Sequence, residues 1–438
     1  MKSLCQINCE LQMKSFYLST TYEPPTPPYP LPIKAPWALL GGISPAQFMQ
    51  QYWHKKPLLV RAAIPAFALA KTAGKPLESP ISAADLAMLA SQPDSECRLI
   101  QSKPWKMARG PFSRKSIPAI GQANWTLLLQ GADTLHPAAK TVLSWFRFIP
   151  DVRLDDLMIS IAGPGGGVGP HVDSYDVFLI QMSGRRHWKI STQDDLSLKP
   201  NLPLKILAQF EPSQDWILEP GDMLYLPPHV AHEGVSLDAG CQTWSVGFRV
   251  ASYRELLQEG LWRLAESLDA IPALDQHYQD PQQDATDQPD TLPPELLKQL
   301  RMHLKSLKLD SVDAMLPGIA SYLSEPKPHA VFSCPDQTLS AKAFAQYLKG
   351  NPLHLQPQTR VTRLGNAVFC NGENQTDGQS LAVKLCWNVL SERHCLPPLS
   401  QENSAYLADI ATGNNSLYEA YCSGWLLITE KTKGRYNN

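Results

Sequence analysis

The stretch GPGGGVGPHVDSYDVFLIQMSGRRHWK, residues 163–189, is the part of the sequence that decides the fold. It opens with a cluster of glycines that first suggests a phosphate-binding loop. The Gly-Lys-Ser/Thr ending of that motif is absent, and a strand-like run follows where the motif would need a helix. The glycines therefore predict a tight turn that lets backbone approach a ligand closely.

Three chemically active side chains follow the glycines at a spacing of two. His171, Asp173 and Tyr175 lie at positions i, i+2 and i+4, so on a strand they would point to the same face. An imidazole beside a carboxylate supplies two adjacent ligands for a divalent metal, and a third must come from another strand. His229 and His232 are available downstream. Two histidines and one carboxylate leave open positions, as non-haem iron(II) oxygenases require.

Other interpretations of this pattern stay open. A His-x-Asp pair is also common as a hydrogen-bonded surface pair, although the glycine-rich lead-in and the downstream run LPPHVAHEG favour a metal site. Two histidines and a carboxylate also bind zinc, which would make the chain a hydrolase. A non-enzymatic cupin scaffold that binds a partner through its C-terminal part would make no use of the three ligands.

Arg186 is the second candidate site residue. Strand periodicity in RHWKI places Arg186 with Trp188 and Ile190 on the apolar face. A buried charge without a partner is costly, so Arg186 needs an anion. A dicarboxylate cosubstrate would supply one, because guanidinium binds carboxylate in a bidentate manner. A structural ion pair with a neighbouring Asp or Glu is the alternative.

Short strand-like runs dominate residues 153–250 and predict an antiparallel barrel or sandwich, because Gly and Pro separate them and no helical pattern intervenes. The runs are LDDLMISIA, VDSYDVFLIQM, RHWKIST, DMLYLP and QTWSVGFRV. Helical periodicity is expected at 45–53, at 253–268 and from 296 into the 320s, with a polar, proline-rich loop at 276–295. The run KKPLLVRAA is expected to form a strand, and RVTRLGNAVFCNG a hairpin.

Length and composition predict two or three folded units. The chain has 438 residues, of which 43% are apolar, so most of it can bury a core. The 39 basic residues nearly balance 41 acidic ones, which disfavours nucleic acid or membrane as a partner. Nine cysteines without a CxxC pair indicate reduced thiols. Neither a signal peptide nor a membrane-spanning stretch is found, so a cytoplasmic location is expected.

The ordered motifs resemble the JmjC cupin family. They are His171-x-Asp173, GRRxW, PGD, LYxP and His232. Within that family, DDLMIS, PGGGVGPHVDSYDVFLIQ and SVGFR are similar to the bacterial ribosomal oxygenases, which hydroxylate an arginine of large-subunit ribosomal protein sixteen. The resemblance covers roughly residues 37–425.

The resemblance implies an α+β chain built around a double-stranded β-helix (cupin or jelly-roll) core. It divides the chain into a proline-rich arm (1–36), a JmjC catalytic domain (37–250), a helical dimerisation region (251–325) and a winged-helix-like C-terminal domain (326–438). A homodimer, a ribosomal-protein substrate, iron(II), 2-oxoglutarate and O2 are the implied partners and cofactors.

The resemblance also implies residue roles. His171, Asp173 and His232 match the iron ligands, with His232 favoured over His229, and Arg186 matches the residue that binds 2-oxoglutarate. The pocket for the substrate arginine is expected at Asp156, Tyr175 and Met158. An acid beside an aromatic ring suits a guanidinium group. Histidine hydroxylation is the nearest rival activity, because eukaryotic relatives use that residue, and demethylation is a further one.

Overall fold

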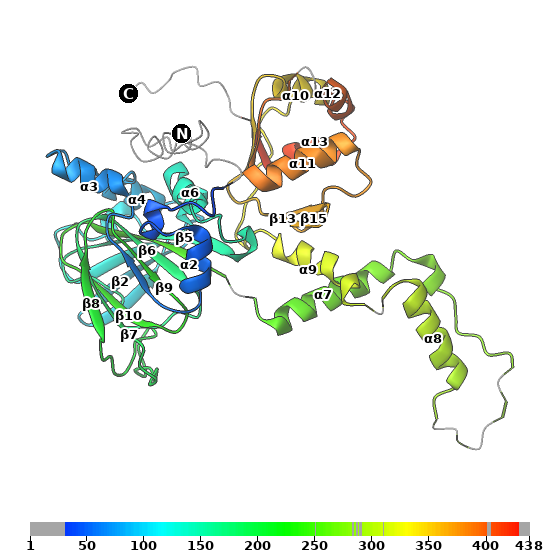
Figure 1. Ribbon diagram of the computed structural model, residues 1–438, viewed down its shortest axis with the longest axis horizontal. Coiled ribbons are helices and arrows are strands. Elements are labelled where there is room, and N and C mark those ends of the chain that lie inside the picture. The colour runs from blue at the N-terminus through cyan, green and yellow to red at the C-terminus, as the bar shows by residue number, and fades with distance from the viewer. Residues whose placement is uncertain are drawn as a thin grey trace, which may run out of the picture. The chain divides into compact units, whose positions relative to one another are not determined.

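A computed structural model describes residues 31–249, 251–282, 284, 285, 288, 291–309, 311–400 and 404–428. The chain divides into two compact units, residues 1–250 and 251–438 (Figure 1). The division predicted at residue 250 lies between these units, and the roles assigned to the parts stay predictions. Most of the expected proline-rich arm lies outside the described residues.

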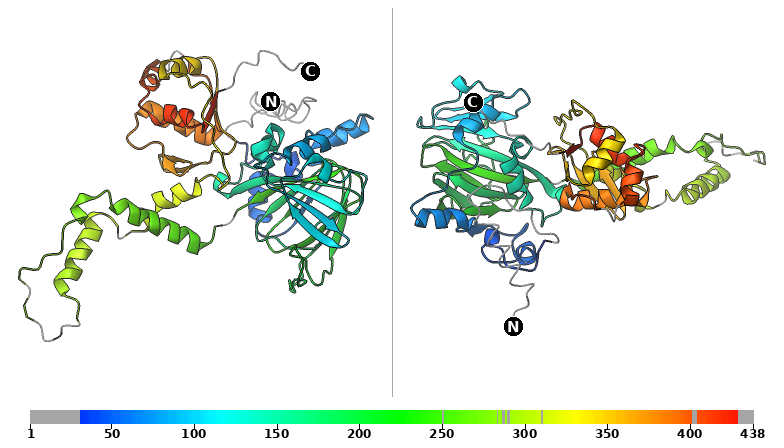
Figure 2. Two further views of the ribbon diagram at one scale, coloured as in Figure 1. Left: turned by 180° about the vertical axis from the view of Figure 1, so that it is seen from behind. Right: turned by 90° about the horizontal axis from the view of Figure 1, so that it is seen from above.

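Two antiparallel sheets form the first unit (Figures 1 and 2). The larger has the order β1 (Leu58–Val60), β9 (Met223–Leu226), β6 (Val177–Ser183), β11 (Cys241–Phe248), β5 (Leu154–Ala162), β4 (Trp125–Leu129), β2 (Cys97–Ser102), β3 (Trp105–Arg109). The smaller has the order β10 (Ala231–Ser236), β7 (Arg186–Ser191), β8 (Gln214–Leu218). The arrangement confirms the antiparallel sandwich predicted from the sequence.

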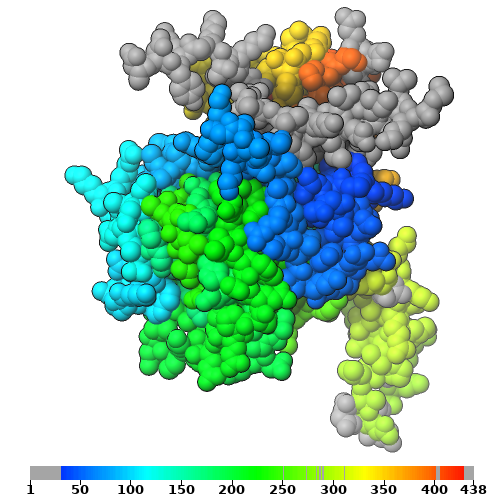
Figure 3. All heavy atoms as spheres, turned by 60° about the vertical axis from the view of Figure 1, so that its left-hand side comes forward, coloured from blue at the N-terminus to red at the C-terminus, as the bar shows by residue number. Residues whose placement is uncertain are grey.

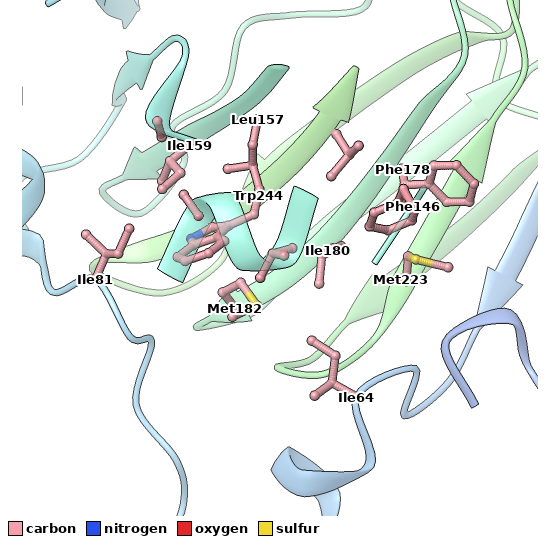
Figure 4. Close-up of a cluster of buried hydrophobic side chains, with 14 of the residues drawn as sticks. Ile64, Ile81, Phe146, Leu157, Ile159, Phe178, Ile180, Met182, Met223 and Trp244 are labelled. Atoms are coloured by element: carbon pink, nitrogen blue, oxygen red, sulfur yellow. The ribbon is translucent and has the colours of Figure 1, made fainter. Parts of the chain in front are cut away.

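Strand β6 is apolar on both faces because each face packs against a different layer. Phe178 and Ile180 belong to the large core that the helices cover. Val177 and Leu179 point the other way, into a smaller core shared with β7 and β8. Figure 4 shows part of the large core, where the rings of Phe178 and Phe146 lie side by side with centroids 4.6 Å apart. Burial on both faces explains the unbroken hydrophobic run of this strand.

Short helices cover the outer face of the larger sheet. They are α2 (Pro45–Gln51), α3 (Pro65–Thr72), α4 (Ala83–Leu89), α5 (Ala132–Leu135) and α6 (Pro137–Ser144), with single turns η1 (Ala38–Leu40), η2 (Arg114–Ser116) and η3 (Asp151–Arg153). Ser44 begins α2 with a capping box, which satisfies backbone N–H groups that the helix leaves open. Phe48 of α2 packs edge-on against Tyr225 of β9, with centroids 4.9 Å apart. This contact joins the predicted helix at 45–53 to the sheet.

The glycine-rich turn lies against the protein's own backbone. A Cβ atom on Gly166 would lie 2.1 Å from the carbonyl oxygen of Trp125, and one on Gly163 would lie 1.8 Å from that of Gln122. Backbone cannot yield as a flexible side chain would, so these two positions require glycine. The turn was predicted to let backbone approach a ligand closely. The close approach seen here instead joins the turn to the segment that enters β4.

The second unit begins with helices. They are α7 (Tyr253–Leu268), α8 (Pro294–Ser306) and α9 (Leu316–Leu323), with the turns η4 (Pro272–Leu274) and η5 (Val312–Ala314). Helix α7 coincides with the predicted run, and the described residues of the predicted loop at 276–295 form no strand and no helix before α8. Glycines allow α7 and α9 to touch, since a Cβ on Gly260 would lie 2.9 Å from Ile319. A Cβ on Gly318 would meet Arg263 at the same distance.

A separate core holds the C-terminal part together. Its helices are α10 (Ala341–Leu348), α11 (Leu381–Arg393), α12 (Ser404–Ile410) and α13 (Ser416–Cys422). One sheet has the order β16 (Cys395–Leu396), β12 (Leu353–Leu355), β17 (Leu426–Ile428), and the other β13 (Val361–Leu364), β14 (Ala367–Cys370), β15 (Glu373–Asn374). The predicted hairpin is β13–β14. The winged-helix-like assignment stays a prediction. Among the described residues, no helix has the length and apolar character needed to cross a bilayer.

Candidate metal and cosubstrate site

An isolated antiparallel bridge brings two of the predicted metal ligands together. The N–H of His171 donates to the carbonyl oxygen of His232 at 3.0 Å, and the N–H of His232 donates to that of His171 at 2.8 Å. The two imidazole rings lie with centroids 4.2 Å apart. Residues 61 positions apart in the chain thereby present their side chains to one point.

The expected strand through Asp173 and Tyr175 is wrong. Strand β6 begins only at Val177, and the residues before it form a bend. The ladder stops because the backbone of Asp173 has a different partner: its carbonyl oxygen accepts from the N–H of His229 at 2.8 Å. His229 has a positive φ of 65° and an exposed side chain, so this residue anchors Asp173 through its backbone.

Asp173 nevertheless completes the predicted triad. A carboxylate oxygen of Asp173 lies 3.6 Å from Nε2 of His232. One potential ligand atom each from His171, Asp173 and His232 lies within 4.8 Å of the others. No other group of three such residues with this geometry occurs among the described parts of the chain. Two nitrogens and one oxygen can hold a divalent metal and leave further positions open.

Both imidazoles are oriented by backbone carbonyl groups. Nδ1 of His171 lies 2.9 Å from the carbonyl oxygen of Gly169, and Nδ1 of His232 lies 2.9 Å from that of Val230. A carbonyl oxygen can only accept, so each Nδ1 carries the proton and each Nε2 keeps its lone pair. Metal-binding histidines are commonly fixed in this way.

Burial keeps His232 neutral. Burial, followed by the nearby His171, lowers the pKa of His232 to about 4. Asp173 and the carbonyl of Val230 oppose this shift but are weaker. A metal needs the neutral imidazole as a ligand, so the environment of His232 favours the form that binds.

Arg186 is a buried charge whose hydrogen-bonding capacity is largely unused. Its side chain is 4% exposed, and Nε and Nη2 have no hydrogen-bond partner. Nη1 makes one long contact, 3.4 Å to the carbonyl oxygen of Gly234. No carboxylate lies within ion-pair distance of it among the described residues. The structural ion pair that the sequence left open is therefore not formed, and the site can accept an anion with at least two oxygens.

Trp188 lies between Arg186 and the histidines. Its ring centroid is 5.9 Å from that of His232, and the guanidinium carbon of Arg186 is 5.9 Å from the Trp188 ring. The register of β7 against β10 pairs Trp188 with Gly234. A Cβ on Gly234 would lie 2.7 Å from the indole, so this glycine makes room for the ring. The predicted inward face of β7, with Ile190 as its third member, is confirmed by burial.

Asp156 is buried on β5, with one oxygen fixed by two donors. Its Oδ2 accepts from the side-chain amide of Gln130 at 2.8 Å and from the backbone N–H of Gly131 at 2.7 Å. Gly247 has no side chain and so leaves space beside Asp156. A Cβ atom on Gly247 would lie 3.8 Å from Oδ1 of Asp156, its nearest side-chain neighbour. The ring of Tyr175 borders the same space at 3.9 Å. Two predicted pocket residues thus face each other across a glycine.

Apolar and charged side chains both lie near Asp156 and Tyr175. Met158 is half-buried, and its sulfur lies 3.9 Å from Nη2 of Arg98, which also donates to the side-chain oxygen of Gln130 at 3.3 Å. Partial burial of Tyr175, which is 39% exposed, raises its pKa, and so do the nearby carboxylates of Asp173 and Asp156. The phenol of Tyr175 therefore stays protonated and neutral beside these carboxylates.

Sequence reasoning missed two residues beside the predicted substrate pocket, Arg98 and Gln130. Both come from strands that precede the motif-rich stretch, on β2 and directly after β4. No local pattern marked them, since their role comes from sheet register: β2 pairs with β4, and β4 with β5. A polar residue directly after the largely apolar run WTLLL was the only available signal.

The fold and the site together define a class. A model of the JmjC domain matches residues 141–256, which contain the triad and Arg186. The chain is 33% identical to the ribosomal protein uL16 3-hydroxylase of Escherichia coli over 333 residues, 74% of this chain and 84% of that protein. It is 34% identical to a probable ribosomal oxygenase of Haemophilus influenzae, over 49% of this chain and 52% of that protein.

Solved structures agree with these relatives. The E. coli ribosomal oxygenase YcfD, solved with cobalt and 2-oxoglutarate, superimposes with a TM-score of 0.67 at 29% identity, over 88% of this chain and 98% of that one. The same enzyme has been solved with cobalt and succinic acid, at the same TM-score. This chain belongs to the JmjC-domain ribosomal oxygenases.

Replacing Arg186 by methionine should stabilise the ligand-free protein. The substitution removes a buried, unpaired charge and keeps an apolar stem of similar length, which should raise the free energy of unfolding by about 1–3 kcal/mol. Denaturant unfolding measures this change. Arg185→Met is the matched control, because exposed Arg185 pairs with Asp238 and should show no gain. A destabilised Arg186→Met protein would show that Arg186 already has a partner.

Proposed function

We propose that this chain is an iron(II)- and 2-oxoglutarate-dependent hydroxylase that oxidises an arginine of a large-subunit ribosomal protein at its β-carbon. The observation that carries the proposal is the buried, unpaired guanidinium of Arg186 on the same inner face as the His171–Asp173–His232 triad. A zinc hydrolase would need the triad but would leave Arg186 without a role. A dicarboxylate that also binds the metal uses both features.

The side chains would divide the work as follows. Nε2 of His171, Nε2 of His232 and the carboxylate of Asp173 would hold iron(II), and Arg186 would hold the distal carboxylate of 2-oxoglutarate. When bound, iron and 2-oxoglutarate supply with O2 the oxidising chemistry that amino-acid side chains lack. The protein contributes position, because Trp188 fixes the spacing between Arg186 and the metal ligands and keeps water from that wall.

The pocket over Gly247 would receive the substrate side chain. Asp156 offers an oxygen to a guanidinium group while Gln130 and Gly131 hold the carboxylate in place. The neutral ring of Tyr175 supplies a surface on which a planar cation can lie. A buried carboxylate favours a permanently charged arginine over a mostly neutral histidine.

We also propose a homodimer formed through the helical region. Tyr253, Leu257 and Leu261 lie four residues apart on α7 and are 87%, 47% and 56% exposed, and Trp262 is 67% exposed. Contiguous apolar surface of this kind marks an interaction site. A second copy would cover it, in keeping with the dimerisation role that the sequence resemblance implies for this region.

Removal of any one of the three ligands should abolish productive iron binding. His171→Ala, Asp173→Ala and His232→Ala should each weaken affinity for iron(II) or manganese(II) by about 100-fold or more. This loss exceeds the one typical of removing a residue that only hydrogen-bonds to a metal ligand. Calorimetry with manganese measures affinity, and succinate formation from 2-oxoglutarate measures turnover. His229→Ala is the control and should keep both. Zinc-dependent hydrolysis without succinate would favour the hydrolase instead.

Arginine recognition should depend on Asp156 and on the residue that orients it. Asp156→Ala should cost about 2 kcal/mol or more in affinity for an arginine peptide of the ribosomal protein, roughly 30-fold in Kd. Gln130→Met keeps the shape but loses the hydrogen bond to a charged group, so a roughly tenfold loss is expected. Asp155→Ala and Gln193→Met serve as controls.

The measurement combines peptide binding with mass spectrometry of the product. One added oxygen on arginine, reduced in both variants and unchanged in both controls, is the expected result. An added oxygen on a histidine of the peptide would show that the enzyme is a histidine hydroxylase instead. Unaltered arginine oxidation in Asp156→Ala would contradict the assigned pocket.

The dimer should separate when the exposed face of α7 becomes polar. Leu257→Ser together with Leu261→Ser should convert the sedimenting species from dimer to monomer, because the apolar surface that a second copy would cover is removed. Leu69→Ser with Met88→Ser, at positions 54% and 51% exposed in the first unit, is the matched control. A wild-type protein that sediments as a monomer would refute this proposal.

A further inference from the structure

One segment of the first unit carries several basic residues and no acidic ones. Residues 97–132 contain six Lys or Arg and no Asp or Glu, which leaves 33 basic against 41 acidic residues in the rest of the chain. The near-neutral total therefore hides a local excess of positive charge. The segment forms the β2–β3 hairpin, η2 and β4. The wider balance of the chain disfavoured nucleic acid as a partner, and this local excess reverses that expectation for one surface.

Five of the six basic side chains are exposed and lack acidic partners. No ion pair links any of them to a carboxylate among the described residues, whereas other cations of this unit have partners, such as Arg61 with Asp222 and Arg147 with Asp151. The five are Lys103, Lys106, Arg109, Arg114 and Lys115. We call them the basic hairpin surface. Lys106 and Arg109 project from opposite faces of β3, which is the edge strand of the larger sheet, so the positive charges lie on both sides of this edge. Figure 3 shows the segment in cyan at the surface of the first unit, beside the residues coloured green.

The register of the hairpin sets two positively charged residues opposite each other. Arg98 on β2 lies directly opposite Arg109 on β3. Like charges in this position destabilise a strand pair. Arg98 is tied to Gln130 and Met158, so it cannot move away freely. An anion bound at Arg109 would relieve the repulsion.

The surface begins beside the candidate site. Trp105, at the start of β3, lies 3.2 Å from where a Cβ of Gly169 would be, and Gly169 orients His171. Arg98 lies beside the predicted pocket residue Met158. A partner that binds along the hairpin therefore lies next to a substrate that enters the pocket.

We propose that the basic hairpin surface binds the phosphate backbone of RNA next to the substrate. This step rests on the proposed function: a ribosomal protein is itself bound to RNA, and its phosphates complement the exposed lysines and arginines. A free, basic ribosomal peptide would be repelled by the same surface. The surface thus favours a substrate that is presented on RNA, and it reads charge rather than sequence.

The test measures binding of the full chain to a fluorescein-labelled RNA hairpin of about 30 nucleotides, by anisotropy at several salt concentrations. Two variants are compared with the wild type. The surface variant changes Lys103, Lys106, Arg109 and Lys115 to Gln; the control variant changes Lys34, Lys75, Lys199 and Lys205, also exposed in the first unit. Thermal melts check that both variants fold.

The surface variant should bind at least about tenfold more weakly at 100 mM salt. Its slope of log Kd against log salt should fall by about three, since each neutralised phosphate contributes roughly 0.7–0.9. The control variant should bind as the wild type does. Equal losses in both variants, or no wild-type binding at 50 mM salt, would overturn the inference.

A further comparison separates the partner classes. Polyglutamate that competes as well as RNA at equal charge would assign the surface to an acidic protein instead, and would overturn the choice of RNA. Oxidation of the ribosomal protein within intact large ribosomal subunits by the wild type is read in parallel. Failure of that reaction alone, with RNA binding intact, would count against the proposed function and remove the reason for placing the RNA next to a substrate.

Discussion

The single antiparallel bridge between His171 and His232 is the constraint on which the candidate site depends. Its two backbone hydrogen bonds join the end of the glycine-rich turn to β10. On one side the turn can reach this position only because Gly163 and Gly166 let backbone pass against the segment entering β4. On the other side β10 is held by its full register with β7, which carries Arg186. The geometry of the triad and the placement of Arg186 therefore follow from one pairing.

A second constraint is electrostatic. Folding buries Arg186 without a counter-charge, which lowers the free energy of unfolding. The packing of the surrounding sheets must offset this loss. Such a cost is typical of sites arranged for a ligand rather than for the stability of the free protein. Asp156 differs, because its buried carboxylate is stabilised by Gln130 and Gly131. Arg186 therefore lacks a counter-charge until an anion binds, whereas the charge of Asp156 is stabilised by groups of the protein itself.

The sequence predicted these features where the local pattern was regular. Period two placed Arg186 on the inner face correctly, because β7 pairs along its whole length. The same rule failed for Asp173 and Tyr175, because only His171 is paired there and the chain then bends toward His229. The three ligands still converge, since metal geometry needs proximity and not a continuous strand. Gln130 could not be found locally, as its role arises from the order of three strands.

The charges of the first unit also alternate in sign between its buried sites and its surface. Arg186 and Asp156 are both buried, 4% and 3% exposed; Arg186 needs an anion, whereas Asp156 suits a cation. The exposed basic hairpin surface needs an anion again. A substrate in which a positively charged side chain projects from a phosphate-rich environment matches Asp156 and the basic hairpin surface. A small dicarboxylate matches Arg186. Opposite charges at these sites would keep either ligand from binding stably in the place of the other, because each wrong placement sets like charges against each other.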